Sequence, residues 1–356
     1  MASGIRQLTV GETVEHDPPP LVRIAGRTLV PTEVFDTYWR FAAARQAMYM
    51  RRLEGSTPPW TADPILRDHR FTNAYRAADR VSQFLIGDVI YAEDSPRQVH
   101  DVVFRILLFK LFNRIDTWSA LESALGEIHW RSFDFTRYGE ALDEAAREGP
   151  VYSAAYVMPP PRLGERSKRL NHLRLLERMM RDGLAVFIED RPGLERVYER
   201  LLAYPSMGRF LAFQFTIDLN YSDAMEASED EFVVAGPGAC DGIVKCFGKA
   251  ARGIESDVIR YMADTQDSHF ARLGLDFPGL FGRRLQLIDC QNLFCEVDKY
   301  ARVVHPSVAG VSGRTRIKQK FKPISEPLRA FFPPKWRLAR PVAAPTLAEP
   351  QLALFG

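Results

Sequence analysis

Apolar residues recur along much of this chain at the three- and four-residue spacing of an amphipathic helix. One such pattern begins at Thr32 and continues through Phe35, Tyr38 and Phe41. Strand-like runs are short and few, so the pattern predicts a mainly α fold, a helical bundle with few short strands. Further helices are expected over residues 73–90, 102–115, 170–180 and 207–219, and the almost wholly apolar 102–115 is predicted to be the central buried helix.

Proline-rich and basic segments divide the chain into three predicted parts. Residues 1–30, which include Pro18-Pro19-Pro20, are expected to be a flexible lead-in. Residues 31–325 are expected to form one helical domain. Residues 326–356 are predicted to be a tail, basic at first and then disordered, because its last part is rich in proline and alanine.

Composition narrows the class of protein. No apolar segment is long enough to span a bilayer, and the N-terminus lacks the apolar core of a signal peptide, so we expect a cytoplasmic protein without a membrane partner. The cysteines have neither the C-x-x-C spacing nor the nearby histidine of a metal site. We therefore expect no metal and no cofactor. The cysteines are Cys240, Cys246, Cys290 and Cys295.

A glycine-rich turn, Gly236-Pro237-Gly238, separates an apolar stretch from an apolar-periodic helix. Gly236 and Gly238 allow a tight turn, after which the free N–H groups of the next helix can hold one phosphate. The pattern is typical of a helix-hairpin-helix turn that grips the DNA backbone, with Lys245 on the following helix. The alternative is an ordinary connection with glycine at a helix cap.

A second predicted helix starts at Asp289, which is placed to cap it. Asn292, Glu296 and Lys299 lie on one stripe of this helix, whereas Asp298 points away from the apolar face and is expected to be solvated. An ionised carboxylate at a helix N-terminus can stabilise an oxocarbenium-like sugar, with Glu296 and Lys299 assisting. The alternative is a plain capping aspartate with a surface Glu–Lys pair.

Polar residues interrupt two other apolar helices and form a candidate substrate or phosphate pocket. A cation inside an apolar helix requires a partner or a ligand, and structural salt bridges to Asp79 or Asp116 are the alternative. The candidates are Asn73, Arg76 and Arg80 on the first helix, Arg105, Lys110 and Asn113 on the second, and Asn292 on the helix of Asp289.

The chain becomes strongly basic after Gly313, although its net charge is only +2. A cation occupies every second position, which in an extended chain places all of them on one side, facing a phosphate backbone. A solvated surface strand is the alternative. These residues are Arg314, Arg316, Lys318, Lys320 and Lys322.

The last residues resemble the Gln-Leu-x-Leu-Phe peptide by which bacterial replication and repair proteins dock on the sliding clamp. They are Gln351, Leu352, Leu354 and Phe355. A tail that packs on its own domain is the alternative.

Several segments together resemble the helical domain of 5-hydroxymethyluracil DNA kinases, which also occurs in proposed glutamyl/putrescinyl-thymine pyrophosphorylases. The resemblance covers residues 34–322 and implies a helix-hairpin-helix DNA glycosylase-like fold. It implies that Asp289 is catalytic, with Asp298 as the rival. The segments begin with Trp60-Thr61-Ala62-Asp63-Pro64, Arg70-Phe71-Thr72-Asn73-Ala74-Tyr75-Arg76 and Phe104-Arg105, and continue with Gly236-Pro237-Gly238 and residues 289–299.

Three functions follow from these observations. The first is a DNA glycosylase that flips a modified pyrimidine out of the duplex and cleaves its N-glycosidic bond. The second is a pyrophosphorylase or transferase step of thymine hypermodification. The third is a non-catalytic DNA-binding adaptor recruited by the sliding clamp. The sequence contains no G-x-x-x-x-G-K-[ST], so P-loop phosphorylation is not predicted.

Overall fold

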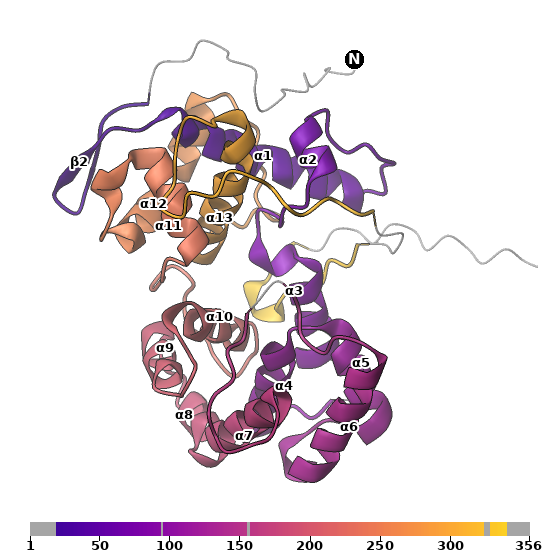
Figure 1. Cartoon of the computed structure of the whole chain (residues 1–356). Coiled ribbons are helices and arrows are strands. Elements are labelled where there is room, and N and C mark those ends of the chain that lie inside the picture. The colour runs from indigo at the N-terminus through magenta and orange to yellow at the C-terminus, as the bar shows by residue number, and fades with distance from the viewer. Residues whose placement is uncertain (1–18, 94, 155–156, 324–327, 340–356) are drawn as a thin grey trace, which may run out of the picture.

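Helices of the computed structural model gather into two lobes, and the structure describes residues 19–93, 95–154, 157–323 and 328–339 (Figure 1). The first lobe combines an early and a late part of the described chain: β1 (Val22–Ile24), β2 (Arg27–Leu29), α1 (Glu33–Leu53), α2 (Pro64–Asp68), α11 (Pro237–Phe247), α12 (Glu255–Arg272) and α13 (Leu287–Val304). The second lobe is continuous in sequence: α3 (Arg80–Phe84), α4 (Val99–Phe112), α5 (Ile115–Leu125), α6 (Phe135–Glu148), α7 (Lys168–Arg181), α8 (Leu184–Glu189), α9 (Leu194–Leu202) and α10 (Arg209–Asn220).

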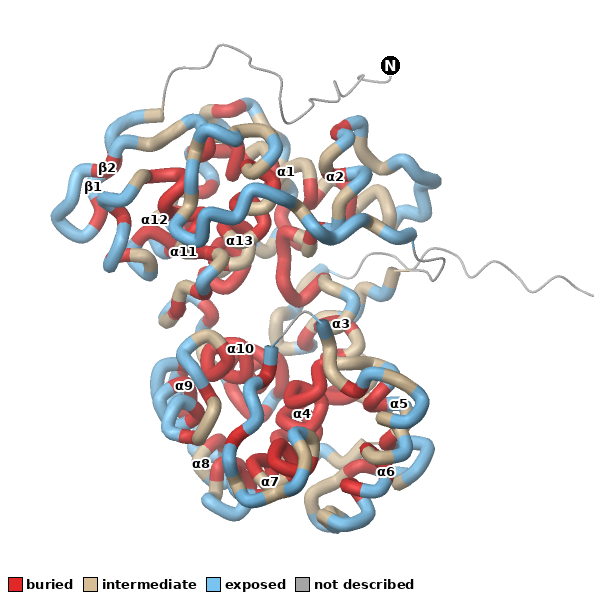
Figure 2. The backbone as a smooth tube through the Cα atoms, viewed as in Figure 1, coloured by how far each residue is buried: buried red, intermediate tan, exposed pale blue. Residues whose placement is uncertain are grey.

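The prediction of a mainly helical protein is confirmed, and the described sheet is one antiparallel hairpin, β1–β2. Helix α1 begins where expected, because the Thr32 hydroxyl accepts from the Val34 N–H and caps it. Helix α4 is the predicted central helix: all its residues from Asp101 onward are buried (Figure 2). The apolar pattern therefore located the cores of both lobes.

Residues 73–90 do not form the single helix that the sequence predicted. The segment contains a short 3-10 turn, η1 (Arg76–Ala78), then α3, then a π-helical stretch, η2 (Leu85–Ile90). Local side-chain bonds break it: the Asp79 carboxylate accepts from the Asn73 N–H, and the Asn73 amide donates to the Ala78 carbonyl. Such bonds compete with helix formation.

The glycine-rich turn leads into α11 from an irregular segment, since residues 226–235 form no helix. The first helix of the expected helix-hairpin-helix therefore does not directly precede the turn, because α10 already ends at Asn220. Gly236 is the N-cap and Pro237 the first residue of α11. The glycines of α11 instead allow close packing on α13. A Cβ on Gly242 would lie 2.1 Å from the Phe294 carbonyl oxygen, and one on Gly238 would lie 3.0 Å from Cys295 Sγ.

The two ends of the described chain are more structured than the sequence predicts. Residues 22–29 of the expected lead-in form the β1–β2 hairpin, in which Val22 pairs with Leu29. Near the other end, residues 328–338, which we call the strap, run between the two lobes and include η5 (Pro334–Trp336), yellow in Figure 1. The strap is rich in aromatic residues that pack on both lobes.

Within the described parts of the chain, no helix is long and apolar enough to cross a membrane. All four cysteines are free thiols, and Cys246 and Cys290 are buried.

Candidate functional site

A group of buried polar residues lies where the two lobes meet, and we call it the interlobe cluster. Its central residue, Asp289, is buried on the first turn of α13. Its Oδ1 accepts from the Arg76 N–H at 2.9 Å, and its Oδ2 accepts from the Gln286 N–H at 3.1 Å. Gln286 is the N-cap, so Asp289 is not the cap itself but the third residue, completing a capping box. The cluster consists of Arg76, Asp218, Tyr221, Glu229, Arg283 and Asp289.

Arg76 joins the cluster to the second lobe. Its guanidinium lies 2.7 Å from Asp218 Oδ1 and donates to the Tyr221 hydroxyl at 2.9 Å. Lys110, from the central helix α4, binds the other Asp218 oxygen at 2.7 Å. The structure therefore brings the predicted residues Arg76, Lys110 and Asp289 together, although they lie far apart in the sequence.

Burial governs the ionisation of the two carboxyl groups that border the lobes. Desolvation raises the pKa of Asp289 to about 7, and the nearby Glu229 carboxylate raises it further, against the lowering effect of the backbone N–H groups. Desolvation also raises the pKa of Glu229, which is opposed mainly by Arg283. The Glu229 Oε1 atom is buried and has no hydrogen-bond partner among the described residues. Such perturbed carboxyl groups are typical of functional sites.

The strap covers this cluster. The Trp336 ring lies with its centroid 4.1 Å from the Arg283 guanidinium and 5.9 Å from the Tyr221 ring. Lys335 Nζ donates to the Ser222 and Met225 carbonyls at 3.0 and 2.7 Å. Burial lowers the pKa of Lys335 to about 8. An aromatic ring and an amine therefore close the cluster from the solvent side.

A second polar group surrounds the loop that precedes η1. The Thr72 N–H donates to Glu296 at 3.0 Å, and the Asn292 amide donates to the Thr72 hydroxyl at 3.0 Å. Lys299 Nζ lies 2.6 Å from Glu296, and Arg45 donates to Asn73 at 3.1 Å. The predicted stripe of α13 thus holds this loop on the first lobe and lies beside Asp289 on the same helix.

Other predicted residues lie elsewhere. Arg105 is buried in α4 and donates to the Val89 and Pro96 carbonyls, and Asn113 ends α4 in a left-handed conformation. Arg80 is exposed at the start of α3. Asp298, expected to be solvated, is buried, because Lys245 Nζ lies 3.1 Å from its Oδ1 and Arg302 also pairs with it. Lys245 therefore lies between α11 and α13.

The basic ribbon, residues 314–322, runs extended and exposed over the first lobe (Figure 2). Ile317 and Phe321 are half-buried, whereas Thr315 and Gln319 are exposed like the cations, so burial alternates over only part of the ribbon. The ribbon is held at one edge, because the Arg70 N–H donates to the Gln319 carbonyl and the Phe321 N–H to the Asp68 carbonyl. All five predicted cations are exposed: Arg314, Arg316, Lys318, Lys320 and Lys322.

The four predicted clamp-binding residues lie outside the described residues: Gln351, Leu352, Leu354 and Phe355. In the described parts of the chain, no group of three or more His, Cys, Asp or Glu residues could hold a metal ion.

Sequence reasoning missed the partners that complete the interlobe cluster. Tyr221, Glu229 and Arg283 follow or precede helices in irregular segments, where no periodicity singles them out. Trp336 had a weak signal, an apolar cluster inside a basic tail. Only the packing of the two lobes brings these residues to Asp289.

A mainly helical protein with a buried acid–base cluster beside an exposed cationic segment fits the class of enzymes that act on nucleic acid. The family model for the helical domain of 5-hmdU DNA kinase matches residues 32–310, and the chain belongs to this family. The chain is also similar to a 5-hmdU DNA kinase of Bacillus phage SP10, with 27% identity over 288 residues. That match covers 75% of this chain but 45% of the relative, so the chain spans less than half of the relative's length. No solved structure matches.

These findings correct the predicted function. The family and the relative are named for a kinase, which phosphorylates, and not for cleavage of an N-glycosidic bond. The glycosylase prediction is therefore wrong, and neither the pyrophosphorylase or transferase alternative nor the clamp-recruited adaptor matches. The prediction failed because a carboxylate at a helix N-terminus occurs in enzymes with different chemistries and does not identify one of them. In this structure both oxygens of Asp289 accept backbone N–H groups.

Proposed function

We propose that this chain binds DNA containing 5-hydroxymethyl-2′-deoxyuridine and presents the hydroxymethyl group for phosphorylation. Membership of the 5-hmdU DNA kinase helical-domain family supports the substrate and the reaction. The phage relative, named for the same activity, extends well beyond the matched region. The nucleotide that donates the phosphoryl group is not assigned to residues of this chain.

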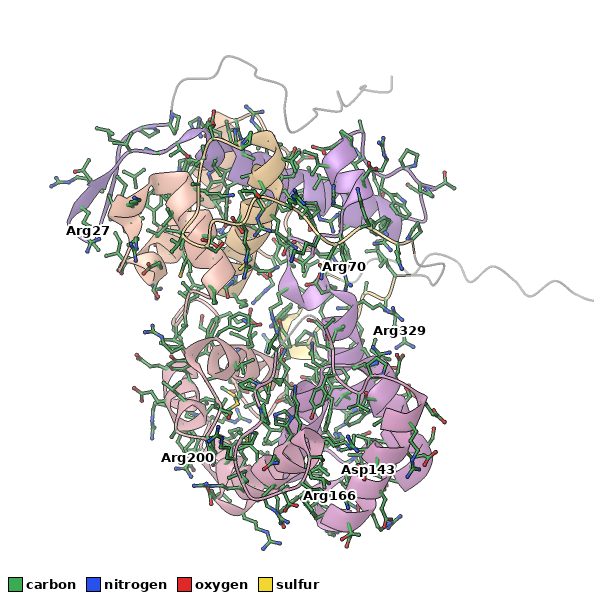
Figure 3. The ribbon with its side chains drawn as sticks, viewed as in Figure 1. Arg27, Arg70, Asp143, Arg166, Arg200 and Arg329 are labelled. Atoms are coloured by element: carbon green, nitrogen blue, oxygen red, sulfur yellow. The ribbon has the colours of Figure 1, made fainter. Side chains whose placement is uncertain are left out.

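One observation carries the proposal: a single segment connects the basic ribbon to the interlobe cluster. Residues 68–70 bind the ribbon through backbone hydrogen bonds, and six residues later Arg76 binds Asp289. Arg70 is exposed where the two lobes meet (Figure 3). A DNA strand whose phosphates lie on the ribbon is thereby led to the cluster, since phosphate contacts fix the register of DNA on a protein.

The cluster supplies the groups that phosphorylation of a hydroxyl requires. In the proposed step, the hydroxymethyl oxygen attacks the terminal phosphorus of a nucleoside triphosphate, and the bond to the departing diphosphate breaks. The hydroxyl proton passes to Glu229 Oε1, the buried oxygen without a partner. Arg283 and Arg76 offset the negative charge that develops. Asp289 positions Arg76 through its backbone N–H.

The predicted domain boundaries and the predicted fold type are part of this proposal. We place the base-acting unit in residues 31–325, on a glycosylase-like helical fold with α11 and α13 at its centre. The close packing of α11 on α13 and the position of Asp289 on α13 support this placement. Docking of the tail on a sliding clamp stays a prediction.

The first experiment measures binding. Fluorescence anisotropy compares a duplex that carries one 5-hydroxymethyluracil with the same duplex carrying thymine, over a series of salt concentrations. We expect tighter binding of the modified duplex. The double variant Lys318→Gln/Lys322→Gln should lower the slope of log affinity against log salt by about 2, at roughly 0.9 per phosphate contact. The matched control, Arg23→Gln/Lys249→Gln, changes two exposed cations outside the ribbon and should leave the slope unchanged.

The second experiment measures transfer of radiolabelled phosphate from ATP to the modified duplex. The chain is assayed alone and together with the part of the phage relative that lies outside the match. We expect labelled 5-hydroxymethyluracil in at least the second mixture, and a loss of roughly 100-fold or more with Glu229→Gln at unchanged DNA affinity. Equal binding of both duplexes, or no labelled base in either mixture, would refute the proposal.

A further inference from the structure

An apolar hollow beside the basic ribbon is separate from the interlobe cluster. It has a volume of about 550 Å³, within the range of small-ligand pockets. Buried Met48 and Leu66 line it, and Trp60 and Phe321 form two of its walls. Lys320, from the ribbon, lines its rim. The hollow therefore joins an apolar interior to a cationic edge.

The two aromatic walls are fixed in place yet half-exposed. Trp60 Nε1 donates to the Ser56 carbonyl at 2.7 Å, and Arg51 donates to the Trp60 carbonyl at 2.7 Å. The Phe321 N–H donates to the Asp68 carbonyl at 3.0 Å. The rings stand almost perpendicular, at 85°, with centroids 6.4 Å apart, so together they form a corner. A planar ring that enters this corner stacks on one aromatic face and meets the edge of the other.

The surrounding charge selects the occupant. Lys318, Lys320 and Lys322 are all exposed along the ribbon beside the hollow, and Arg67 lines it from α2. The acid among the lining residues, Asp68, lies 3.0 Å from Arg67 and is paired with it. A planar apolar group attached to a polyanion fits both features, and an unpaired nucleotide is such a ligand.

We propose that the corner between Trp60 and Phe321 is a stacking subsite for one unpaired base of DNA whose phosphates lie on the basic ribbon. The inference rests on the proposed function in that it takes DNA as the ligand. Every base has a π-face, so stacking of this kind tolerates sequence. The subsite therefore detects that a base is unpaired and does not select its identity, which favours DNA whose strands are opened near the modified base.

The test uses the full chain and two DNAs that differ in one nucleotide: a perfect duplex, and the same duplex with a single bulged 2-aminopurine. We expect the wild-type chain to quench the 2-aminopurine fluorescence and to prefer the bulged DNA. Trp60→Ala should weaken binding of the bulged DNA roughly 10-fold and abolish the quenching, with the affinity for the perfect duplex unchanged. Replacing the bulged base by thymine or cytosine should change the wild-type affinity little.

Two further variants keep the test independent of folding. Phe321→Leu preserves apolar volume but removes the ring, and should lower bulge affinity in the same way. Phe187→Leu changes a half-exposed ring on α8 and should have no effect. Equal affinity for both DNAs, or quenching that survives Trp60→Ala and Phe321→Leu, overturns the subsite but leaves the proposed function standing. Absence of binding to either DNA at low salt overturns both, and capture of an apolar peptide without DNA binding identifies a protein partner instead.

Discussion

At the scale of single residues, the buried carboxyl groups differ most from their ordinary behaviour. Asp289 is almost fully removed from water, and both of its oxygens accept backbone N–H groups. The N–H groups favour the ionised form, but desolvation outweighs them. The sequence position of Asp289 could indicate that this carboxylate lies at a helix N-terminus, where the helix dipole favours the ionised form. It could not indicate the opposing effect, which arises from burial and from the Glu229 carboxylate, a residue distant in the sequence.

The raised pKa of Asp289 predicts a pH dependence of stability. In the folded chain this carboxyl keeps its proton up to about pH 7, whereas its ordinary pKa is 3.8. Between these values the unfolded chain binds fewer protons at this group, so its contribution to the free energy of unfolding falls as pH rises. Urea denaturation of wild type and Asp289→Asn should therefore show a wild-type advantage that is largest near the lower pH and shrinks toward neutrality.

A matched substitution isolates this effect. Asp267 is exposed on α12, so Asp267→Asn removes a carboxylate that is not buried. If the difference between wild type and Asp289→Asn widens as pH rises, the N–H groups dominate over desolvation and the assignment is wrong.

At the scale of elements, the contact between α11 and α13 determines how the first lobe is built. Gly238 and Gly242 lie four residues apart on one face of α11, against Cys295 and the Phe294 backbone. The sequence contains these glycines, but it does not show whether they form a turn or allow two helices to pack closely. Only the position of α13 shows that the backbones approach closely.

Gly242→Ala is predicted to be strongly destabilising. The new Cβ would lie 2.1 Å from the Phe294 carbonyl oxygen, a backbone atom that cannot rotate away, so the helices must separate. We expect a loss of roughly 2–3 kcal/mol, at the upper end of overpacking costs, measured as a lower urea midpoint at similar slope. Gly149→Ala is the control, since its Cβ meets no atom within 4 Å. Equal midpoints for the two variants would contradict the packing argument.

At the scale of the whole molecule, the strap links the two lobes across the interlobe cluster. Trp336 contacts Arg283 on one side and Tyr221 on the other, and Arg329 pairs with Asp88 of the second lobe. The strap follows the basic ribbon along the chain.

Trp336→Ala is predicted to loosen the junction of the lobes. Amide hydrogen exchange should become faster in residues 221–225 and 281–285, which the strap covers, since the ring contacts there are lost. The melting temperature should fall by a few degrees, as for a loss of about 1 kcal/mol. Trp130→Ala is the matched control, because Trp130 packs on Phe104 and Phe133 inside the second lobe. An identical exchange pattern in both variants would show that the strap does not hold the lobes together.

The sequence by itself determined the helical class, the start of α1 and the burial of α4. These are local properties, because capping and periodicity act over a few residues. The tertiary structure alone decided that Asp289 and Arg76 belong to one cluster with Glu229 and Arg283, that Lys110 binds Asp218 of that cluster, and that Lys245 and Asp298 form a buried pair. Desolvation and long-range pairing depend on neighbours that are distant in sequence, and local patterns carry no information about them.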